Sequence, residues 1–450
     1  NNPNSMKKNE SLLMSLCLSL FLFIGCSTDS DILSNEDSRE NIELRKTINK
    51  GANMELEEAT QPERVDNQLV VRFRKPYDYE NNDQYNNMKA EKRDLYNVIA
   101  YQSCSCDDNR VELWTLAPNI DVETKLGVMD TEEDLEGDFQ FLLEKKDVTA
   151  WYNTNTSTSI NNSHPAISAT NAGADVVVAV IDSGVNYNYS KFQDGFLYKG
   201  GLGGSCYSTT EYNYEYSGWN FADNNNDPFD DYGHGTVVTA LVTNQLDAVN
   251  VDYRVLPVKV FNKEGKTSYF KIACGFNYAA ENTDVNIIVS SLGWYLPNEE
   301  RKQRIVEAII KESEDTKIIF ASAGNANIDS NATDIIHYPS GHGFNNILSV
   351  AGTNTTLSGT LLSNEIKLAW FSNSGTSYVD IAAPSENIPF DFNGKTFYVS
   401  GTSFANAYAA GKAALLFNNQ SITSLKSSVI NSATPYQSLV GKVRYKKALE

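Results

Sequence analysis

The stretch SGTSFANAYAAG, residues 400–411, presents the hydroxyl of Ser403 between a Gly-Thr pair and a run of small residues that favours a helix. A serine in this position has two interpretations. Its oxygen can cap the helix by accepting backbone N–H groups of the first turn. Alternatively, it is a nucleophile at the positive end of the helix dipole. A nucleophilic serine needs a base, so other parts of the sequence must decide between the two.

Two further polar residues have the types that such a serine requires. Asp182 ends the apolar run VVVAVID, and His234 lies between two glycines that leave room for a substrate. A histidine accepts the serine proton, and an aspartate holds the histidine tautomer and stabilises the imidazolium. Each residue alone also fits a structural role, as a helix cap or a loop residue. Together with Ser403 they predict hydrolysis through an acyl-enzyme intermediate.

The order Asp, His, Ser resembles that of the subtilisin-like serine proteases, over about residues 160–449. VIDSGVN resembles the aspartate motif of this family, GHGT its histidine motif and GTSFA its serine motif. FASAGN resembles its oxyanion segment and SSLG its substrate-pairing strand, while FSNSGTSYVDIAAP and GKVRYKKAL match further segments. The resemblance implies a serine endopeptidase that acts on protein or peptide substrates.

The resemblance also assigns site residues, each at the position that matches a family motif. The implied catalytic residues are Asp182, His234, Ser403 and Asn325, which donates to the oxyanion. The implied substrate-binding residues are Ser291, Leu292, Gly293 and Gly324. These small and apolar groups, with the uncharged Ala326 beside them, favour an uncharged side chain at P1, the substrate residue whose carbonyl is attacked.

Two departures from the family pattern leave undecided the structure of the pocket floor and of the start of the helix that contains Ser403. The family usually continues Met-Ala-x-Pro-His after the serine, whereas residues 404–408 read FANAY and lack the proline. Val237 follows GHGT where a histidine is usual. Neither position is a catalytic group, so the reaction class is unaffected.

The loop before His234, WNFADNNNDPFDD, is rich in oxygen ligands of the kind that calcium prefers. Some family members bind calcium in the matching loop, and the positions that would ligate it here are Asn220, Asn225 and Asp227. These three residues carry fewer charges than a tight site needs. A solvated turn is therefore the favoured interpretation, calcium the alternative, and no cofactor is expected to be required.

The elements that must position these residues are apolar strands alternating with helical segments. Continuous Val/Ile runs indicate a parallel sheet covered on both faces, with active groups at the carboxyl ends of its strands. The expected fold class is α/β, a subtilisin-like three-layer fold with a mainly parallel central sheet flanked by helices. The expected strands are residues 175–182, 253–261, 285–293, 316–324 and 346–353.

The expected catalytic domain covers residues 164–450. The chain before it divides into four segments. Residues 6–25 have the layout of a signal peptide, and LFIGC resembles a lipobox, which predicts cleavage before Cys26 and lipidation of its thiol. Plain secretion is the alternative. Residues 26–62 are expected to be a flexible tether. Residues 63–148, with strands at 67–74 and 110–116, are expected to form a small α/β pro-domain, joined by a processing linker at residues 149–163.

These segments predict an exported protein held in the bacterial cell envelope by a lipid on Cys26, at the outer membrane or the cell surface. The pro-domain is expected to assist folding and to inhibit the enzyme, and residues 151–163 are expected to pass through the active site and be cut by Ser403. A formal charge of −20 over 450 residues argues against nucleic acid as a partner.

Four cysteines remain outside the signal peptide and the lipidation site: Cys104, Cys106, Cys206 and Cys274. Export permits disulfides, and Cys206–Cys274 is one pairing to consider, although sequence does not fix connectivity. Cys104-Ser105-Cys106 is weak support for a metal or redox site because it has no second ligand pair.

Two other functions remain to be weighed against an active protease. An inactive homologue would only bind peptides, but the presence of all four implied catalytic residues argues against it. In the second alternative, residues 63–148 form a binding module that carries the function of the protein, and the protease domain contributes no activity to it. The resemblance of NQLVVRFR to the strands of family pro-domains argues against that function.

Overall fold

The structure is a computed structural model that describes residues 59–74, 82–106, 110–145, 174–199, 206–208, 213–297, 303–355 and 365–450. The predicted signal peptide, Cys26 and the predicted linker at residues 149–163 lie outside these residues. Within the described residues, no helix combines the length and the apolar composition that crossing a membrane would require.

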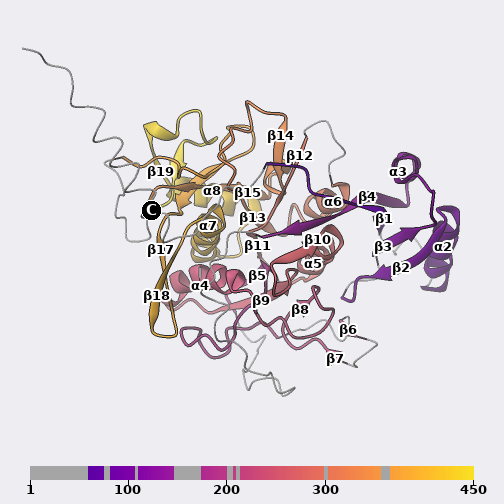
Figure 1. The fold of residues 1–450 in the computed structure, drawn as a ribbon. Coiled ribbons are helices and arrows are strands. Elements are labelled where there is room, and N and C mark those ends of the chain that lie inside the picture. The colour runs from indigo at the N-terminus through magenta and orange to yellow at the C-terminus, as the bar shows by residue number, and fades with distance from the viewer. Residues whose placement is uncertain are drawn as a thin grey trace, which may run out of the picture. The chain divides into compact units, whose positions relative to one another are not determined.

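A nine-stranded sheet lies at the centre of the C-terminal domain, residues 174–450 (Figure 1). Its strands follow the order β19-β20-β16-β15-β13-β11-β5-β9-β8, and only the β19–β20 pair is antiparallel. Every residue of β5, β9 and β11 is buried, as a sheet covered on both faces requires. The predicted parallel sheet and its five strands are confirmed. The strands are β5 (Val176–Asp182), β8 (Trp219–Asn220), β9 (Tyr253–Lys259), β11 (Ile287–Ser290), β13 (Ile318–Ser322), β15 (Ile347–Thr353), β16 (Ile381–Pro384), β19 (Thr434–Pro435) and β20 (Lys447–Ala448).

Helices cover both faces of this sheet and complete three layers (Figure 1). Along β5, Val176, Val178 and Val180 pack into one apolar cluster with α4, α7 and α8. The intervening residues of β5 pack into a second cluster, with α5 and α6. Side chains that alternate along a strand thus fill both cores. The helices are α4 (His234–Asp247), α5 (Tyr269–Glu281), α6 (Arg304–Glu312), α7 (Thr402–Leu416) and α8 (Ile422–Ser432).

Several short strands and 3-10 helices lie outside the central sheet and its covering helices. Three two-stranded sheets pair β6 with β7, β12 with β14 and β17 with β18. Their bounds are β6 (Tyr207–Ser208), β7 (Asn213–Tyr214), β12 (Trp294–Pro297), β14 (Ile335–Tyr338), β17 (Ile388–Phe392) and β18 (Lys395–Val399), with 3-10 helices η3 (Ser340–His342) and η4 (Gln437–Leu439).

The N-terminal domain, described over residues 59–145, is a small unit of two helices and antiparallel strands. Its strands follow the order β4-β1-β3-β2, and β10 of the C-terminal domain extends this sheet beside β4. Trp114 is fully buried in a core that this domain forms by itself. The elements are β1 (Arg64–Phe73), α2 (Asn82–Leu95), β2 (Val98–Ser103), β3 (Val111–Leu116), α3 (Val122–Met129), β4 (Leu135–Glu144) and β10 (Lys266–Ser268).

Strand β4 also contacts two helices of the C-terminal domain, and both domains belong to one compact unit, Asn49–Glu450. The buried Asp138 carboxylate accepts hydrogen bonds from the backbone N–H groups of Arg304, at 3.0 Å, and Ile305, at 2.8 Å. It therefore caps the first turn of α6, where unpaired N–H groups favour a negative charge. Gln140 similarly accepts from the backbone N–H of Phe270 at the start of α5, at 3.1 Å.

Two disulfides connect the domains: Cys104 with Cys274, and Cys106 with Cys206. The considered pairing Cys206–Cys274 is wrong. Each of these two cysteines lies against a cysteine of the N-terminal domain, and sequence separation does not reveal such a contact. The same pairings account for Cys104-Ser105-Cys106, which forms two structural bonds.

Candidate active site

Asp182 and His234 meet where β5 ends and α4 begins, and both are fully buried. His234 Nδ1 lies 2.8 Å from Asp182 Oδ1 and 2.9 Å from Oδ2, so Nδ1 carries the proton and donates to the carboxylate. Nε2 is then the acceptor nitrogen of the ring. Burial favours a higher pKa for Asp182, but attraction to His234 and Lys145 outweighs it and lowers that pKa.

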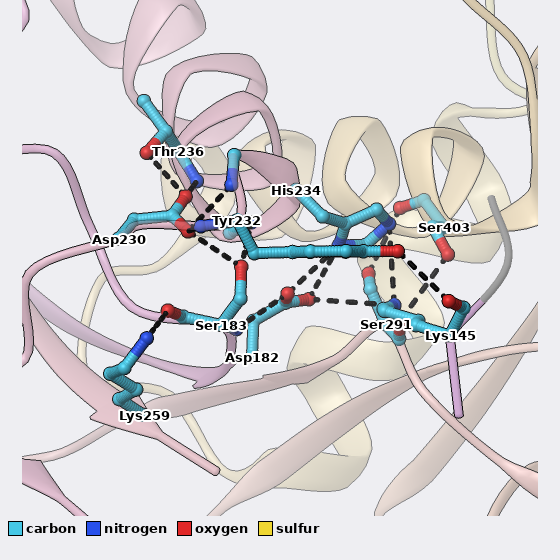
Figure 2. Close-up of polar contacts among 12 residues, drawn as sticks. Lys145, Asp182, Ser183, Asp230, Tyr232, His234, Thr236, Lys259, Ser291 and Ser403 are labelled. Atoms are coloured by element: carbon cyan, nitrogen blue, oxygen red, sulfur yellow. Dashed lines mark hydrogen bonds and ion pairs between the residues drawn. The ribbon is translucent and has the colours of Figure 1, made fainter. Parts of the chain in front are cut away.

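A second buried carboxylate, Asp230, holds the turn that presents His234, and the sequence analysis did not identify it. It accepts from the backbone N–H groups of Gly233, at 2.7 Å, and Thr236, at 2.8 Å. It also accepts from the hydroxyl of Ser183, at 2.9 Å, so it ties the end of β5 to the start of α4 (Figure 2). Burial raises the pKa of Asp230 despite these bonds. The only signal in the sequence was an aspartate four residues before His234.

Ser403 lies in the first turn of α7, beside His234 in Figure 2. The residue that caps this helix is Gly401, and no side chain makes a capping bond there, so the cap interpretation of Ser403 is wrong. Its Oγ donates to the carbonyl oxygen of Ser291 at 3.3 Å, and its own carbonyl accepts from the Ser291 hydroxyl at 2.9 Å. The hydroxyl is thus held at the ends of β11 and α7 beside the imidazole.

The amide of Asn325 is oriented by Thr402, the residue before Ser403. Asn325 Oδ1 accepts from the Thr402 backbone N–H at 2.9 Å and from its hydroxyl at 2.8 Å. Because only the oxygen of an amide can accept from an N–H group, the opposite end of the amide carries the NH₂ donors. Asn325 and Ser403 line the same cleft.

This cleft is a narrow cavity of about 40 Å³, lined by five of the eight predicted catalytic and substrate-binding residues; Asp182 and His234 are not among its lining residues. Gly324 does not line it but packs behind it, because a Cβ there would lie 2.5 Å from both Asn373 Nδ2 and Tyr295 Oη. The lining residues are Leu143, Glu144, Lys145, Phe261, Ser291, Leu292, Gly293, Ser322, Asn325, His337 and Ser403.

His337, from β14, forms part of the cleft wall and was not predicted. A Cβ on Gly293 would lie 2.1 Å from His337 Cε1 and Nε2, so this edge of the ring packs against the predicted substrate-binding segment. The Ser340 hydroxyl donates to the His337 carbonyl and accepts from Nδ1, each at 2.9 Å, which leaves Nε2 as an acceptor. Burial, with the charge of Lys145, lowers the pKa of His337 to about 3, so the ring is neutral.

The last residues of β4 form one wall of the cleft and pair with β10 as an added strand. Leu142, Leu143 and Glu144 pair antiparallel with β10. The next backbone N–H, of Lys145, donates to the carbonyl of Gly265 at 2.8 Å, and the Tyr232 hydroxyl donates to the carbonyl of Lys145 at 2.9 Å. We call residues 142–145 the tail. Main-chain hydrogen bonds of this kind bind an extended peptide to a sheet edge largely independently of its sequence.

The Lys145 side chain reaches the candidate catalytic groups (Figure 2). Its Nζ donates to the Ser291 carbonyl at 2.6 Å and lies 3.3 Å from His234 Nε2 and 3.9 Å from Asp182 Oδ2. Since Nδ1 holds the ring proton, Nε2 accepts from this ammonium. The nitrogen that would take a proton from Ser403 is therefore engaged by the tail. The predicted cleft segment, residues 151–163, lies outside the described residues.

The loop proposed for calcium uses its side-chain oxygens to hold its own backbone. Asn220 Oδ1 accepts from the N–H of Asp223, and Asn225 Oδ1 from the N–H of Asp227, both at 2.9 Å. Asp227 Oδ1 accepts from the Tyr187 hydroxyl at 2.8 Å. Over the described part of the chain, no three His, Cys, Asp or Glu side chains gather as a metal site. The geometry favours a turn, and calcium binding stays a prediction.

The departures from the family pattern leave the site geometry in place. Helix α7 begins at Thr402 without a proline, and Val237 is buried on α4. Buried Asn406 donates through Nδ2 to the carbonyls of Ser290, at 3.3 Å, and Phe320, at 3.1 Å. These bonds join α7 to the carboxyl end of β11 and to β13, and so fix Ser403 above the sheet.

Comparisons with known proteins agree with this arrangement. The model of the family described as "Subtilase family" matches residues 173–445. The cell wall-associated protease of Bacillus subtilis is 32% identical over 44% of this chain and 21% of its own length. The intracellular serine protease of Paenibacillus polymyxa is 30% identical over 56% of this chain and 69% of its own length.

A solved structure, of a cold adapted subtilisin-like serine proteinase, is 24% identical, covers 62% of this chain and 91% of its own, and has a TM-score of 0.45. The family model alone spans more than half of the chain and every predicted catalytic residue. The chain belongs to the subtilase family of serine-type endopeptidases.

Proposed function

We propose that this subtilase hydrolyses peptide bonds of proteins or peptides with Ser403 as the nucleophile, His234 as its base and Asp182 as the group that holds the base. The observation that carries the proposal is the contact of His234 Nδ1 with both carboxylate oxygens of Asp182, at 2.8 and 2.9 Å. This contact turns Nε2 toward the start of α7, where Ser403 lies. Attack by Ser403 then gives an acyl-enzyme, which water hydrolyses.

Asn325 supplies the donor for the oxyanion of the tetrahedral intermediate. Thr402 occupies the oxygen end of the Asn325 amide, and the residue lines the cleft with Ser403. A donor held in this way needs little rearrangement when negative charge develops on the substrate carbonyl.

The N-terminal domain acts as an inhibitor of the same chain. Its tail pairs with β10 as a peptide substrate would, and Lys145 engages the base. A tail paired with β10 and lining the cleft leaves no room there for another peptide, and an ammonium on Nε2 competes with the Ser403 hydroxyl for the acceptor. Both contacts support inhibition in cis.

The chain is cut shortly after Lys145. The backbone N–H of Lys145 donates to the Gly265 carbonyl, and the Lys145 carbonyl accepts from the Tyr232 hydroxyl, so this residue is held beside the cleft. Lys145 Nζ and Ser403 Oγ both donate to the carbonyl of Ser291, so the tail ends beside the proposed nucleophile. The proposed cut therefore lies nearer to β4 than residues 151–163.

The test combines active-site labelling with processing. Purified wild type and the variants Ser403→Ala and Ser427→Ala, an exposed serine of α8, are incubated with a fluorophosphonate and analysed by gel mobility and N-terminal sequencing. We expect a cut shortly after Lys145, and labelling in the presence of dithiothreitol, in wild type and Ser427→Ala, and neither in Ser403→Ala. The cut should proceed at a rate independent of protein concentration, because the tail is part of the same molecule. Normal processing of purified Ser403→Ala would mean that another enzyme cuts the chain.

Export and attachment to the cell envelope complete the proposal. Residues 6–25 and the sequence LFIGC support a signal peptide and a lipidated Cys26. Of the two relatives described above, one is named as cell wall-associated and the other as intracellular, so the signal-like sequence carries this part of the proposal.

A further inference from the structure

Both disulfides of the described chain cross from the N-terminal domain to the C-terminal domain. Cys104 and Cys106 follow β2, whereas Cys274 lies in α5 and Cys206 precedes β6. The bridges span 170 and 100 residues of sequence. All four cysteines are buried, so these bonds form part of the interior between the domains.

The position of these bonds relative to the proposed cut decides what a cut can release. Cys104 and Cys106 precede Lys145, and their partners follow residue 173, the end of the segment that separates the described parts of the two domains. A backbone cut anywhere between residues 146 and 173 therefore leaves the two fragments covalently joined. Either bond alone is sufficient to hold them.

The non-covalent contacts direct the attached domain back to the same position. Arg72 makes two hydrogen bonds with Glu312, at 2.9 and 2.7 Å, and Asp138 caps α6. A tethered partner rebinds at an effective concentration of about millimolar order. A tail that was cut but not released would therefore return to the cleft faster than most substrates arrive.

We propose that the cut N-terminal domain remains a covalently attached inhibitor, and that reduction of both disulfides by thiols is the step that frees the cleft. This inference rests on the proposed function, because it takes the tail to be the inhibitor and the cut to lie after Lys145. It adds that a backbone cut alone does not activate the enzyme.

The chemistry is thiol–disulfide exchange. A low-molecular-weight thiolate attacks one sulfur and displaces the other as a cysteine thiolate, and a second thiol resolves the mixed disulfide. Each bond takes two electrons from two thiols, which leave as one oxidised disulfide, so full release consumes four thiols. Because all four cysteines are at most 4% exposed, the thiol must reach them through an opening of the interface.

The first experiment tests the covalent link without relying on self-cleavage. The recognition sequence of a site-specific protease is inserted between residues 149 and 163 of the full-length Ser403→Ala variant, which is then cut. We expect one species on a non-reducing gel and two fragments after dithiothreitol. The added double substitution Cys104→Ser with Cys106→Ser should give two fragments without reductant, whereas each single substitution should not. Two fragments from the cut parent without reductant would overturn the inference.

The second experiment measures activity and separates this inference from the proposed function. Matured full-length wild type and the double cysteine variant are assayed with a peptide substrate, with and without dithiothreitol. We expect dithiothreitol to raise wild-type activity at least tenfold, and the variant to be active without it and unresponsive to it. Equal wild-type activity in both conditions, with Ser403 labelled, would overturn the disulfide step alone. Absence of labelling in every form, including the reduced one, would overturn the proposed function instead.

Discussion

At the scale of single residues, side chains that do not react decide how the reacting groups point. Thr402 fixes the amide of Asn325, Asp182 fixes the ring of His234, and Ser340 fixes the ring of His337. In each case hydrogen bonds occupy one polar atom of the amide or imidazole and so fix whether the opposite atom donates or accepts. The three following predictions use this orientation.

Asn325→Ala should lower kcat by about 10²–10³ with little change in KM, because the donor acts mainly on the transition state. This magnitude is the one known for the equivalent donor in subtilisin. Steady-state kinetics of the variant and of Asn331→Ala, an exposed asparagine of the same loop, provide the comparison. A loss confined to KM would show that Asn325 binds only the ground state.

Lys145→Met should accelerate the cut after the tail. The ammonium engages His234 Nε2 at 3.3 Å, and a hydrogen bond to a charged group contributes about 1.5–3 kcal/mol, which corresponds to roughly tenfold or more in rate. The measurement is the time course of processing in purified protein. Lys266→Met, an exposed lysine on the facing strand β10, is the matched control and should process at the wild-type rate. Slower processing of Lys145→Met would mean that the lysine positions the tail and does not restrain the base.

His337→Ala should broaden the P1 preference toward large side chains. The imidazole forms part of the cleft wall against Gly293, and one methylene in an apolar pocket changes kcat/KM by about tenfold or more. We therefore expect the ratio of kcat/KM for phenylalanine over alanine at P1 to rise at least tenfold. His342→Ala, outside the cleft lining, should leave the ratio unchanged. An unchanged ratio for His337→Ala would place P1 elsewhere.

At the scale of elements, polar side chains at strand and helix ends hold the sheet and its connections together. Lys317, immediately before β13, is 3% exposed and donates to the backbone carbonyls of Asn282, at 2.8 Å, and Val285, at 2.6 Å. It thereby ties the end of α5 and the approach to β11 to the next strand. Burial lowers the pKa of Lys317 to about 8, although Asp284 and Glu281 oppose the shift.

This shift predicts a pH dependence of stability. Between pH 8 and the unfolded value of 10.5, the unfolded chain binds more protons at Lys317 than the folded chain does. The free energy of unfolding contributed by this residue should therefore rise with pH across that window. Thermal unfolding of wild type and Lys317→Met, compared from pH 7.5 to 10, isolates the contribution. A difference in Tm between them that stays constant or falls as pH rises would contradict the prediction.

At the scale of the whole molecule, the proposed lipid on Cys26 and the two disulfides between the domains determine whether the active catalytic domain is held at the membrane or released. If Cys26 carries the lipid, Cys26→Ser should move the protein from the membrane to the soluble fraction, because acyl chains contribute about 0.8 kcal/mol per buried CH₂. Fractionation of producing cells with antibody detection measures this. Unchanged membrane association of Cys26→Ser would refute the lipid anchor.

Under the disulfide inference, the catalytic domain of the wild type should leave the membrane only after both the backbone cut and the reduction of the two disulfides.

The sequence by itself determined the parallel sheet and the identity of the candidate catalytic residues. Continuous runs rich in the β-branched residues Val and Ile are typical of strands in a sheet covered on both faces, which is why β5, β9, β11, β13 and β15 were all predicted. Chemistry restricts the residue types of Asp182, His234 and Ser403, and the resemblance of their motifs and order to those of the subtilase family predicted that they form one site. Local patterns of this kind do not depend on distant contacts.

Only the tertiary structure decided which distant groups meet. His337 joins the cleft through the packing of β14, and Lys145 through the pairing of β4 with β10, and neither contact leaves a signal in the local sequence. The sequence left the cysteine pairing open for the same reason, since a bond spanning 170 residues depends on domain packing and not on spacing. Separation in sequence does not determine distance in space, because each of these contacts forms between elements that fold back on one another.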